Sequence, residues 1–556
     1  MPTITFSFKD LEKLVGRPLT VKQLSKLIEN AKGELSNHDE KTDEITISLD
    51  DTNLPYLWSA EGIARFVKLN TGLQKGISAL EINKSQYELN VEKSVNKVRP
   101  YITAFAAKGN SVDDYLLKQM IQLQEKLSEQ YGTKRKKLAI GIYPLRKINF
   151  PITYKATDPE STAFVPLDFK TGMTQKEILE DHPKGKEYAY ILEGFEKYPV
   201  LVDSENKVLS FPPIINSEET GRVSENEDEL FFEATGTDEN AVNLACNIFA
   251  QALFERGFKI YSVKIKYPEK NVVTPFLKAE TKKINKETIK KLLGIELKDK
   301  ELKQTLEKAG YEFDAKKSLV KIPHYRQDIL HEVDIIEDIA IAYGYDNIKE
   351  LPLTKYTTGK TFDATTFINK IRELTVGLGY QEVFSAVLSN KKLMHEQMNI
   401  SDSGTIELKN PMSETHSAVR SWLIPILLEF LSKNKHVEYP QQIFEQGLVS
   451  VKKEGKINDY ERIAILSCNS KADYTEIRQI ADYLLRSFGI KYDVKETDHN
   501  SFILGRAGRL VVNGIKIGYL GEIQPTVLSN FKLEMPVAAL EINLTELFEA
   551  TKQEKK

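Results

Sequence analysis

The segment from Pro323 to Tyr345, which reads PHYRQDILHEVDIIEDIAIAYGY, combines a helical apolar pattern with a cluster of acids. Asp334, Glu337 and Asp338 are three and four residues apart, so a helix would place their carboxylates on one face. The apolar stripe predicted beside them consists of Val333, Ile336, Ala340 and Tyr343. A chain with this segment must bury the stripe and must also neutralise or hydrate several like charges.

Two interpretations of the acids are open on spacing alone. In the simpler one, the acidic first turn is exposed to water and is favoured by the positive end of the helix dipole. In the other, the carboxylates share a cation, and a set of hard oxygen ligands suits Mg²⁺ better than zinc. Asp328 lies just ahead of the helix, where it would cap free backbone N–H groups or join the cluster.

Length, net charge and cysteine content are those of a globular chain with several domains. Its 556 residues correspond to three to five domains of ordinary size. A formal net charge of -3 gives no global attraction to nucleic acid, so a polyanion would have to meet a local basic patch. Two cysteines far apart indicate neither a disulfide framework nor a zinc site, and no signal peptide or membrane segment is recognisable. We expect a cytoplasmic protein with no membrane or DNA partner.

The order of helical and strand patterns predicts an α+β multidomain fold with four parts. Residues 1–90 form a small N-terminal α+β module, and 91–272 form an α+β module of short strands broken by Pro and Gly, followed by a helix. Residues 273–350 carry a Lys-rich stretch and the acidic helix. Residues 351–556 alternate helices and strands, which predicts an antiparallel sheet flanked by helices.

The acidic segment resembles the winged-helix-like module of the β subunit of phenylalanyl-tRNA synthetase. The match lies in YRQDILHEVDIIEDIAIAYGYDNI. The resemblance implies that Asp328, Asp334, Glu337 and Asp338 form a Mg²⁺ site that is shared with the catalytic α subunit.

The resemblance extends through the N-terminal half. NLPYLWSAEGIARFVKLNTG is similar to the family's N-terminal motif, with Leu54 and Tyr56 in place of an Arg and an Asp. The stretch from KRKKLAIGIYPL to FFEATGTD resembles the editing module of the archaeal and eukaryotic type, with Pro144 where an Asp is more usual. Editing means hydrolysis of tyrosine wrongly attached to the tRNA.

By position, the residues that match the editing pocket are Leu201, Ser210, Glu233 and Thr235. Glu233 stands where a relative carries Asp. Taken singly, these residues have simpler interpretations: Leu201 as core, Ser210 as a polar strand residue and Glu233 as a hydrated edge. No Ser, His and Asp triad is recognisable nearby, and His182 has no Ser partner in sequence, so hydrolysis would use a bound water and the tRNA's own hydroxyl.

The last 200 residues or so resemble an inactive copy of a class II synthetase core, a unit in which we find no catalytic residues for aminoacylation. An active site of that class needs arginines to hold ATP phosphates, and neither an arginine pair nor a phosphate-binding loop is recognisable. Arg420 is interpreted as a structural arginine that pairs with an acid.

The resemblance implies a β subunit in an α2β2 heterotetramer, in which the α subunit uses ATP to charge phenylalanine tRNA. Basic segments at Lys134–Lys137 and at Lys282 and Lys283 are the expected tRNA contacts. The alternative is a stand-alone RNA-binding or deacylating protein built from the same modules. A metal-dependent phosphoryl-transfer enzyme is disfavoured, because no phosphate-binding loop accompanies the carboxylates.

Overall fold

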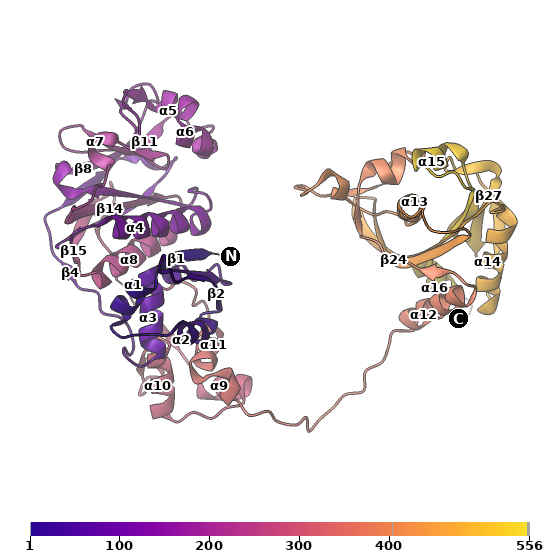
Figure 1. Cartoon of the computed structure of the whole chain (residues 1–556), viewed down its shortest axis with the longest axis horizontal. Coiled ribbons are helices and arrows are strands. Elements are labelled where there is room, and N and C mark those ends of the chain that lie inside the picture. Colours follow the sequence, from indigo (N-terminus) through magenta and orange to yellow (C-terminus); the bar gives the residue numbers. More distant parts are fainter. Residues whose placement is uncertain (1, 278, 403, 553–556) are drawn as a thin grey trace. The chain divides into compact units, whose positions relative to one another are not determined.

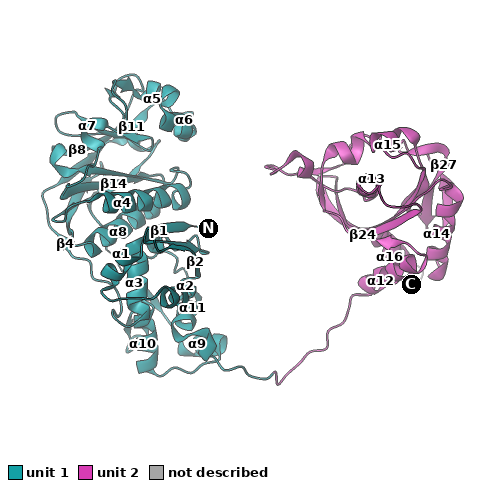
Figure 2. Cartoon of the chain, viewed as in Figure 1, with its two compact units in different colours: residues 1–352 teal, residues 353–556 magenta. Residues whose placement is uncertain are grey.

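The computed structural model describes residues 2–277, 279–402 and 404–552. Its internal contacts divide the chain into two compact units, residues 1–352 and 353–556 (Figure 2). The first three predicted modules therefore pack as one unit. The mixed α+β multidomain class is confirmed, whereas the three boundaries between the four parts stay a prediction.

The first unit begins with a small antiparallel sheet and three helices. The sheet has the order β1-β3-β2, with β1 (Thr3–Ser7), β2 (Gly33–Asp39) and β3 (Glu44–Leu49); the helices are α1 (Phe8–Val15), α2 (Val21–Glu29) and α3 (Ala60–Asn70). Ser59 caps α3 by accepting a hydrogen bond from the backbone N–H of Gly62 at 3.1 Å, which fixes the start of this helix.

An eleven-stranded sheet occupies the middle of the first unit (Figure 1). Its main path is β13-β12-β11-β8-β5-β15-β6-β14-β7, and β4 and β16 also pair with β15. The strands are β4 (Ile82–Asn83), β5 (Glu88–Val91), β6 (Tyr101–Lys108), β7 (Leu138–Pro144), β8 (Ile152–Thr157), β11 (Tyr198–Val202), β12 (Val208–Phe211), β13 (Ile215–Asn216), β14 (Glu229–Gly236), β15 (Lys259–Lys266) and β16 (Asn271–Thr274). Strands β5 and β16 cross the predicted boundaries at 90 and 272, so one sheet extends over both.

Helices and a two-stranded sheet surround this sheet. They are α4 (Asp114–Lys126), α5 (Gln175–Asp181), α6 (Pro183–Tyr188), α7 (Glu218–Gly221), α8 (Glu239–Glu255), β9 (Ala163–Phe164) and β10 (Met173–Thr174). Helix α8 packs on β6 and β14 with twelve buried residues, and that degree of burial is why its sequence is apolar nearly all round.

The acidic helix belongs to a smaller part of the first unit. This part contains β17 (Thr281–Lys283), α9 (Lys286–Leu293), α10 (Asp299–Lys308), β18 (Glu312–Asp314), β19 (Leu319–Lys321) and α11 (Glu332–Tyr343). Helix α11 buries Ile335, Ile336, Ile339 and Ala340, but Val333 is exposed. The predicted stripe was therefore wrong at Val333, because the buried face is centred on the isoleucines instead.

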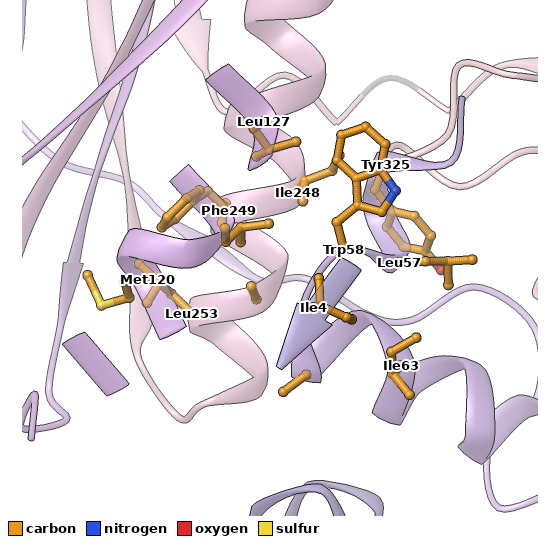
Figure 3. Packing of buried hydrophobic residues seen from close by; sticks show 14 of the residues in the cluster. Ile4, Leu57, Trp58, Ile63, Met120, Leu127, Ile248, Phe249, Leu253 and Tyr325 are labelled. Atoms are coloured by element: carbon orange, nitrogen blue, oxygen red, sulfur yellow. The ribbon is translucent and has the colours of Figure 1, made fainter. Parts of the chain in front are cut away.

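One hydrophobic core joins the parts of the first unit. Figure 3 shows Trp58, Ile248 and Tyr325 in one cluster, although they come from the N-terminal module, the large-sheet module and the loop before α11. Trp58 is completely buried and Tyr325 is nearly so. Because burial of aromatic side chains is worth several kcal/mol, roughly 2–3 each, this cluster holds the three parts together.

The second unit is built on a seven-stranded sheet of order β20-β24-β25-β29-β28-β27-β26. Its strands are β20 (Gln381–Glu382), β24 (Gln441–Lys453), β25 (Lys456–Cys468), β26 (Asp493–Glu496), β27 (Phe502–Val512), β28 (Ile515–Ile523) and β29 (Val537–Asn543). Every pairing is antiparallel except that of β20 with β24. A small sheet contains β21 (Leu388–Ser389), β22 (Ile406–Glu407) and β23 (Ala418–Val419).

Helices cover both faces of this sheet, as the alternation in β25 requires. Ile463 and Ile465 belong to one core cluster, and Ala464 and Leu466 belong to the other. Helices α13 (Ile424–Lys433) and α15 (Pro525–Asn530) contribute to the second of these clusters; α12 (Asp363–Gly377), α14 (Tyr474–Ser487) and α16 (Leu544–Lys552) contribute to the first. The predicted antiparallel sheet flanked by helices is present.

Candidate functional site

A pocket beside strands β7, β12 and β14 brings together three of the four residues of the predicted editing set. Ser210, Glu233 and Thr235 line it. Leu201 is opposite Ser210 in the pairing of β11 with β12, but it is completely buried in a hydrophobic cluster and is not among the lining residues. Its simpler interpretation as a core residue agrees with this position.

The period of two in β14 directs Glu233 toward the pocket. Phe232 and Ala234 face the core cluster that includes α8, so Glu233 and Thr235 lie on the opposite face. Glu233 is opposite Ala104 of β6 on one side and Gly141 of β7 on the other. Since its exposed fraction is 3%, the interpretation of Glu233 as a hydrated edge residue was wrong.

Glu233 has one partnered and one unpartnered carboxyl oxygen. The Tyr143 hydroxyl donates a hydrogen bond to Glu233 Oε1 at 3.0 Å. Within the described residues, Glu233 Oε2 and Ser210 Oγ are buried and have no hydrogen-bond partner. Burial raises the pKa of Glu233 to about 7, against the opposing effects of Tyr143 and Arg99. An orphaned buried acceptor is costly, so this pair of atoms indicates room for a polar ligand group.

Arg99 fixes the third polar member of the pocket. This buried side chain donates from Nε to Thr235 Oγ1 at 3.0 Å, from Nη2 to the Thr235 carbonyl at 2.6 Å and from Nη1 to the Lys136 carbonyl at 3.1 Å. Burial lowers the pKa of Arg99 to about 10. Sequence reasoning missed Arg99, which precedes β6 and carries no local signal of its role.

The basic run after α4 reaches the same pocket through Arg135. Its Nη1 donates to the Ile214 carbonyl at 3.0 Å, and its guanidinium carbon lies 4.2 Å from the centre of the Tyr188 ring. Arg135 and Lys184 are both lining residues, so the pocket has cationic groups beside its buried acid.

His182 also lines the pocket but is occupied with local structure. Its Nδ1 accepts a hydrogen bond from the Lys184 backbone N–H at 3.1 Å and so caps α6. Burial lowers the pKa of His182, which favours the neutral ring. This arrangement agrees with the absence of a triad from the sequence.

The four predicted metal ligands line a second pocket, which lies between the N-terminal helices and α11. Arg326 pairs with two of them: its side chain contacts Asp328, and its Nη1 lies 2.7 Å from Asp338 Oδ2. Arg326 is only 6% exposed, and its guanidinium lies 5.3 Å from the centre of the Tyr56 ring. Repulsion between Asp328 and Asp338 is therefore relieved within the chain.

The other two acids have different partners. Asp334 Oδ2 accepts hydrogen bonds from the backbone N–H groups of Leu330 and His331, which completes a capping box at the start of α11. Asp334 and His331 thus provide the cap, a role for which the sequence left Asp328 as a candidate. Glu337 pairs with Lys32 at 2.6 Å on the surface.

The four carboxylates are chemically suitable ligands for Mg²⁺, but they are not arranged as a complete metal site. Across residues 2–277, 279–402 and 404–552, no three His, Cys, Asp or Glu side chains are arranged so that they alone could hold a metal ion. Asp334 keeps its Oδ1 outside the two capping bonds, and the Lys32 partner of Glu337 is 40% exposed and so can be displaced. These carboxylates therefore do not form a metal site that is complete within the described part of this chain.

In the second unit, Arg420 pairs with an acid, as predicted. Its Nη1 lies 2.5 Å from Glu445 Oε1, and both side chains are almost completely buried. Its Nε donates to the Leu448 carbonyl at 2.8 Å.

Two arginines that the sequence did not single out meet in another pocket of the second unit. Arg462 and Arg509 both line it. Arg462 pairs with Glu541 at 2.9 Å, and Glu541 Oε2 accepts the backbone N–H of Ile424 at the start of α13. Arg509 stacks on Tyr519, with its guanidinium carbon 3.8 Å from the ring centre. Both arginines are engaged by protein groups; they come from β25 and β27, which no sequence motif connects.

Comparison with known proteins agrees with this architecture. Residues 282–345 match the family model described as the tRNA synthetase B5 domain, and residues 349–544 match the phenylalanyl tRNA synthetase beta chain CLM domain. An N-terminal fragment of the phenylalanyl-tRNA synthetase β subunit from Pyrococcus horikoshii is 42% identical in sequence. It covers 62% of this chain and all of its own length, with a TM-score of 0.60. The fold and these matches define a protein of the aminoacyl-tRNA synthetase class.

Full-length relatives give the family. The phenylalanine–tRNA ligase β subunit of Pyrococcus abyssi is 42% identical over 99% of this chain and 100% of its own length. That of Thermococcus onnurineus is also 42% identical, over 99% of each chain. The chain belongs to the family of phenylalanine–tRNA ligase β subunits. Members of this family are parts of the ligase complex.

Within the parts of the chain that the structure covers, no helix is long and apolar enough to cross a bilayer.

Proposed function

We propose that this chain is the non-catalytic β subunit of a phenylalanine–tRNA ligase and works with a catalytic α subunit in an α2β2 assembly in the cytoplasm. The α subunit uses ATP to attach phenylalanine to its tRNA. This chain contributes scaffold, half of a Mg²⁺ site and hydrolysis of tyrosine wrongly attached to that tRNA. The observation that carries the proofreading role is the unpartnered oxygen of Glu233 in the pocket beside β7, β12 and β14.

Discrimination against phenylalanine follows from that pocket. The tyrosine hydroxyl would pair with Glu233 Oε2 and Ser210 Oγ, which are otherwise orphaned. A phenylalanyl group would leave both atoms unpaired in a buried site, and such a site rejects a substrate that lacks the hydroxyl by a large factor, on the order of 10⁴.

Hydrolysis would use a bound water and the tRNA's own hydroxyl, because among the described residues that line the pocket no nucleophile is hydrogen-bonded to a base. His182 has its Nδ1 committed to the cap of α6. The chain's own residues therefore select and orient the aminoacyl group, while Arg135 and Lys184 provide the positive side of the pocket near the tRNA backbone.

Mg²⁺ would be held at α11 by Asp328, Asp334, Glu337 and Asp338 together with ligands from the α subunit. Bound there, the ion would supply positive charge to offset these carboxylates. Glu337 and Asp334 are the most available of the four, since Arg326 already neutralises Asp328 and Asp338.

The decisive experiment is charging of phenylalanine tRNA with phenylalanine and ATP, by this chain alone and after mixing with the candidate α subunit from the same genome. We expect activity only in the mixture. Robust charging by this chain alone would contradict the non-catalytic role, and silence in both would favour the stand-alone protein.

The proofreading role needs a separate measurement. Tyrosyl-tRNA and phenylalanyl-tRNA are each incubated with the assembled complex, and release of the amino acid is followed. We expect fast release of tyrosine only, and a loss of at least tenfold in Glu233→Gln.

A further inference from the structure

Tyr143 of strand β7 is a buried tyrosine behind the pocket, and its hydroxyl contacts residues that line it. It is completely buried, its hydroxyl donates to Glu233 Oε1 at 3.0 Å, and Asn216 Oδ1 lies 3.5 Å away. Strands β7 and β14 are directly paired, with Phe231 opposite Tyr143 and Glu233 opposite Gly141. The contact between Tyr143 and Glu233 is therefore built on two neighbouring strands rather than on a loop.

Gly141 leaves the space in which this contact forms. A Cβ at position 141 would lie 2.3 Å from the Tyr143 hydroxyl and 2.5 Å from Glu233 Oε1. Real Cβ atoms do not approach other atoms so closely, so any larger residue at position 141 would separate the pair.

The hydrogen bond from Tyr143 gives the two carboxyl oxygens of Glu233 different roles. Glu233 Oε1 is satisfied by Tyr143, whereas Oε2 is orphaned, as is Ser210 Oγ in the same pocket. A glutamate has three side-chain torsions, and the last of them is soft. Without a hydrogen bond that fixes the carboxyl group, either oxygen of Glu233 could face the ligand.

We propose that Tyr143 is a positioning residue for specificity, which holds Glu233 Oε1 so that Oε2 and Ser210 Oγ receive the phenolic hydroxyl of a tyrosyl group. This inference rests on the proposed proofreading function. It deepens that function by assigning a role to a tyrosine outside the set that matches the family's pocket. The protein phenol and the substrate phenol would then bind opposite oxygens of one carboxyl group.

The length of the Glu233 side chain explains why its carboxyl group needs a residue that fixes its position. A glutamate side chain is one methylene longer than an aspartate side chain, so its carboxyl group can take more positions. Tyr143 removes that freedom before the ligand binds, and preorganisation of this kind strengthens discrimination.

The charged surroundings of Glu233 set the pH response. Tyr143 of β7 and Arg99, which precedes β6, both favour the ionised carboxylate against burial. The other titratable groups that line the pocket are Glu125, Arg135, Asp168, His182 and Lys184. Loss of the Tyr143 hydroxyl removes one of the two favourable effects, so the pKa of Glu233 should rise.

The test uses the complex of this chain with its α subunit, and compares wild type with Tyr143→Phe. We expect kcat/KM for release of tyrosine from tyrosyl-tRNA to fall at least tenfold in the variant. We also expect the limb of its pH profile that belongs to Glu233 to move to higher pH. Release of phenylalanine and charging by the complex should not change. Tyr190→Phe is the matched control, because that tyrosine is exposed and its hydroxyl donates to the Lys134 carbonyl instead.

Two further variants separate positioning from folding. Gly141→Ala keeps both partners but forces them apart, and should reproduce the loss of Tyr143→Phe. In a Glu233→Asp background the shorter acid should not depend on Tyr143, so adding Tyr143→Phe should cost less than threefold.

The outcomes distinguish the inference from the function on which it rests. If wild-type complex does not release tyrosine from tyrosyl-tRNA, the proofreading function fails. If wild type releases tyrosine and Tyr143→Phe matches it in rate and pH profile, only the role of Tyr143 is overturned.

Discussion

At the scale of single residues, the buried arginines Arg326 and Arg420 are neutralised by acids close to them. Arg326 lies between Asp328 and Asp338, and Arg420 lies against Glu445. Removal of one member of such a pair leaves an uncompensated charge in a medium of low dielectric, which costs more than the pair itself contributes.

Arg326→Gln should therefore lower the stability of the first unit by about 3–5 kcal/mol, because two carboxylates lose their neutralising partner. The measurement is the unfolding midpoint of the first unit in guanidinium or by calorimetry. Lys321→Gln is the control, since its ion pair with Glu312 is about half-exposed and worth at most about 1 kcal/mol. Equal shifts in the two variants would show that Arg326 has no special role.

Glu233 gives a dependence of stability on pH. Its pKa is about 7 in the folded chain, above the ordinary 4.5, so the folded state binds more protons than the unfolded state between these values. Stability should fall as pH rises from 5 to 7, by roughly 2–3 kcal/mol from this group.

Glu233→Gln should remove that part of the slope. The measurement is the difference in unfolding midpoint between variant and wild type at pH 5, 6, 7 and 8. The variant should gain relative to wild type up to about pH 8, where Glu233 of the wild type is almost fully ionised. A constant difference across the range would mean that Glu233 does not titrate there.

The candidate sites show what a sequence can reveal at this scale. Family motifs located Ser210, Glu233 and Thr235, which the structure brings to one pocket. Tyr143 and Arg99 were missed because their roles depend on strand pairing and on burial, neither of which leaves a local pattern. Arg326 stood inside the quoted acidic segment, and an arginine two residues before Asp328 was a usable signal that its partner is internal.

At the scale of elements, close backbone approach decides what a helix tolerates. Helix α3 passes so near the turn before it that a Cβ at Gly62 would lie 2.1 Å from the Tyr56 carbonyl oxygen. In most helices a glycine costs about 1 kcal/mol relative to alanine. At position 62 we expect the opposite, so that alanine makes the protein less stable than glycine does.

Gly62→Ala should destabilise the first unit by about 1–3 kcal/mol, because the turn must shift to admit the methyl group. Calorimetry of the full chain measures this effect. Gly359→Ala is the matched control: a Cβ there meets nothing within 4 Å, so we expect a change within about 0.5 kcal/mol. A neutral or stabilised Gly62→Ala would contradict the close approach.

Helices with clear caps could be predicted from sequence, whereas sheet membership could not. Ser59 caps the start of α3 and Gly132 ends the helical run that begins with α4, and both residues are local sequence signals of a helix end. Strand β7 pairs with β14 in the sheet that also contains β5 and β6, and no local pattern in its sequence indicates that partner. Pairing between distant strands is a tertiary property, and periodicity within a strand does not encode it.

At the scale of the whole molecule, the segment 349–362 connects the two units without regular structure. Every residue of it is exposed, and it includes Lys349, Lys355 and Lys360. An exposed stretch without backbone pairing is where a protease cuts first.

Brief trypsin treatment of the isolated chain should therefore give two resistant fragments with their new ends in this segment. Mass spectrometry of the fragments locates the cuts. A variant with the three lysines replaced by glutamine should resist cleavage much longer, while keeping the remaining tryptic sites. First cuts elsewhere in the chain would contradict the two-unit organisation.

The connecting segment also determines how the chain can engage a large partner. Fully stretched, it spans at most about 50 Å. Once one unit is docked, the other searches only a small volume, at an effective concentration on the order of millimolar. If each unit makes its own contact with the partner, the two contacts together bind much more tightly than either one alone. Cutting the tether should therefore loosen the assembly by orders of magnitude while leaving each contact intact.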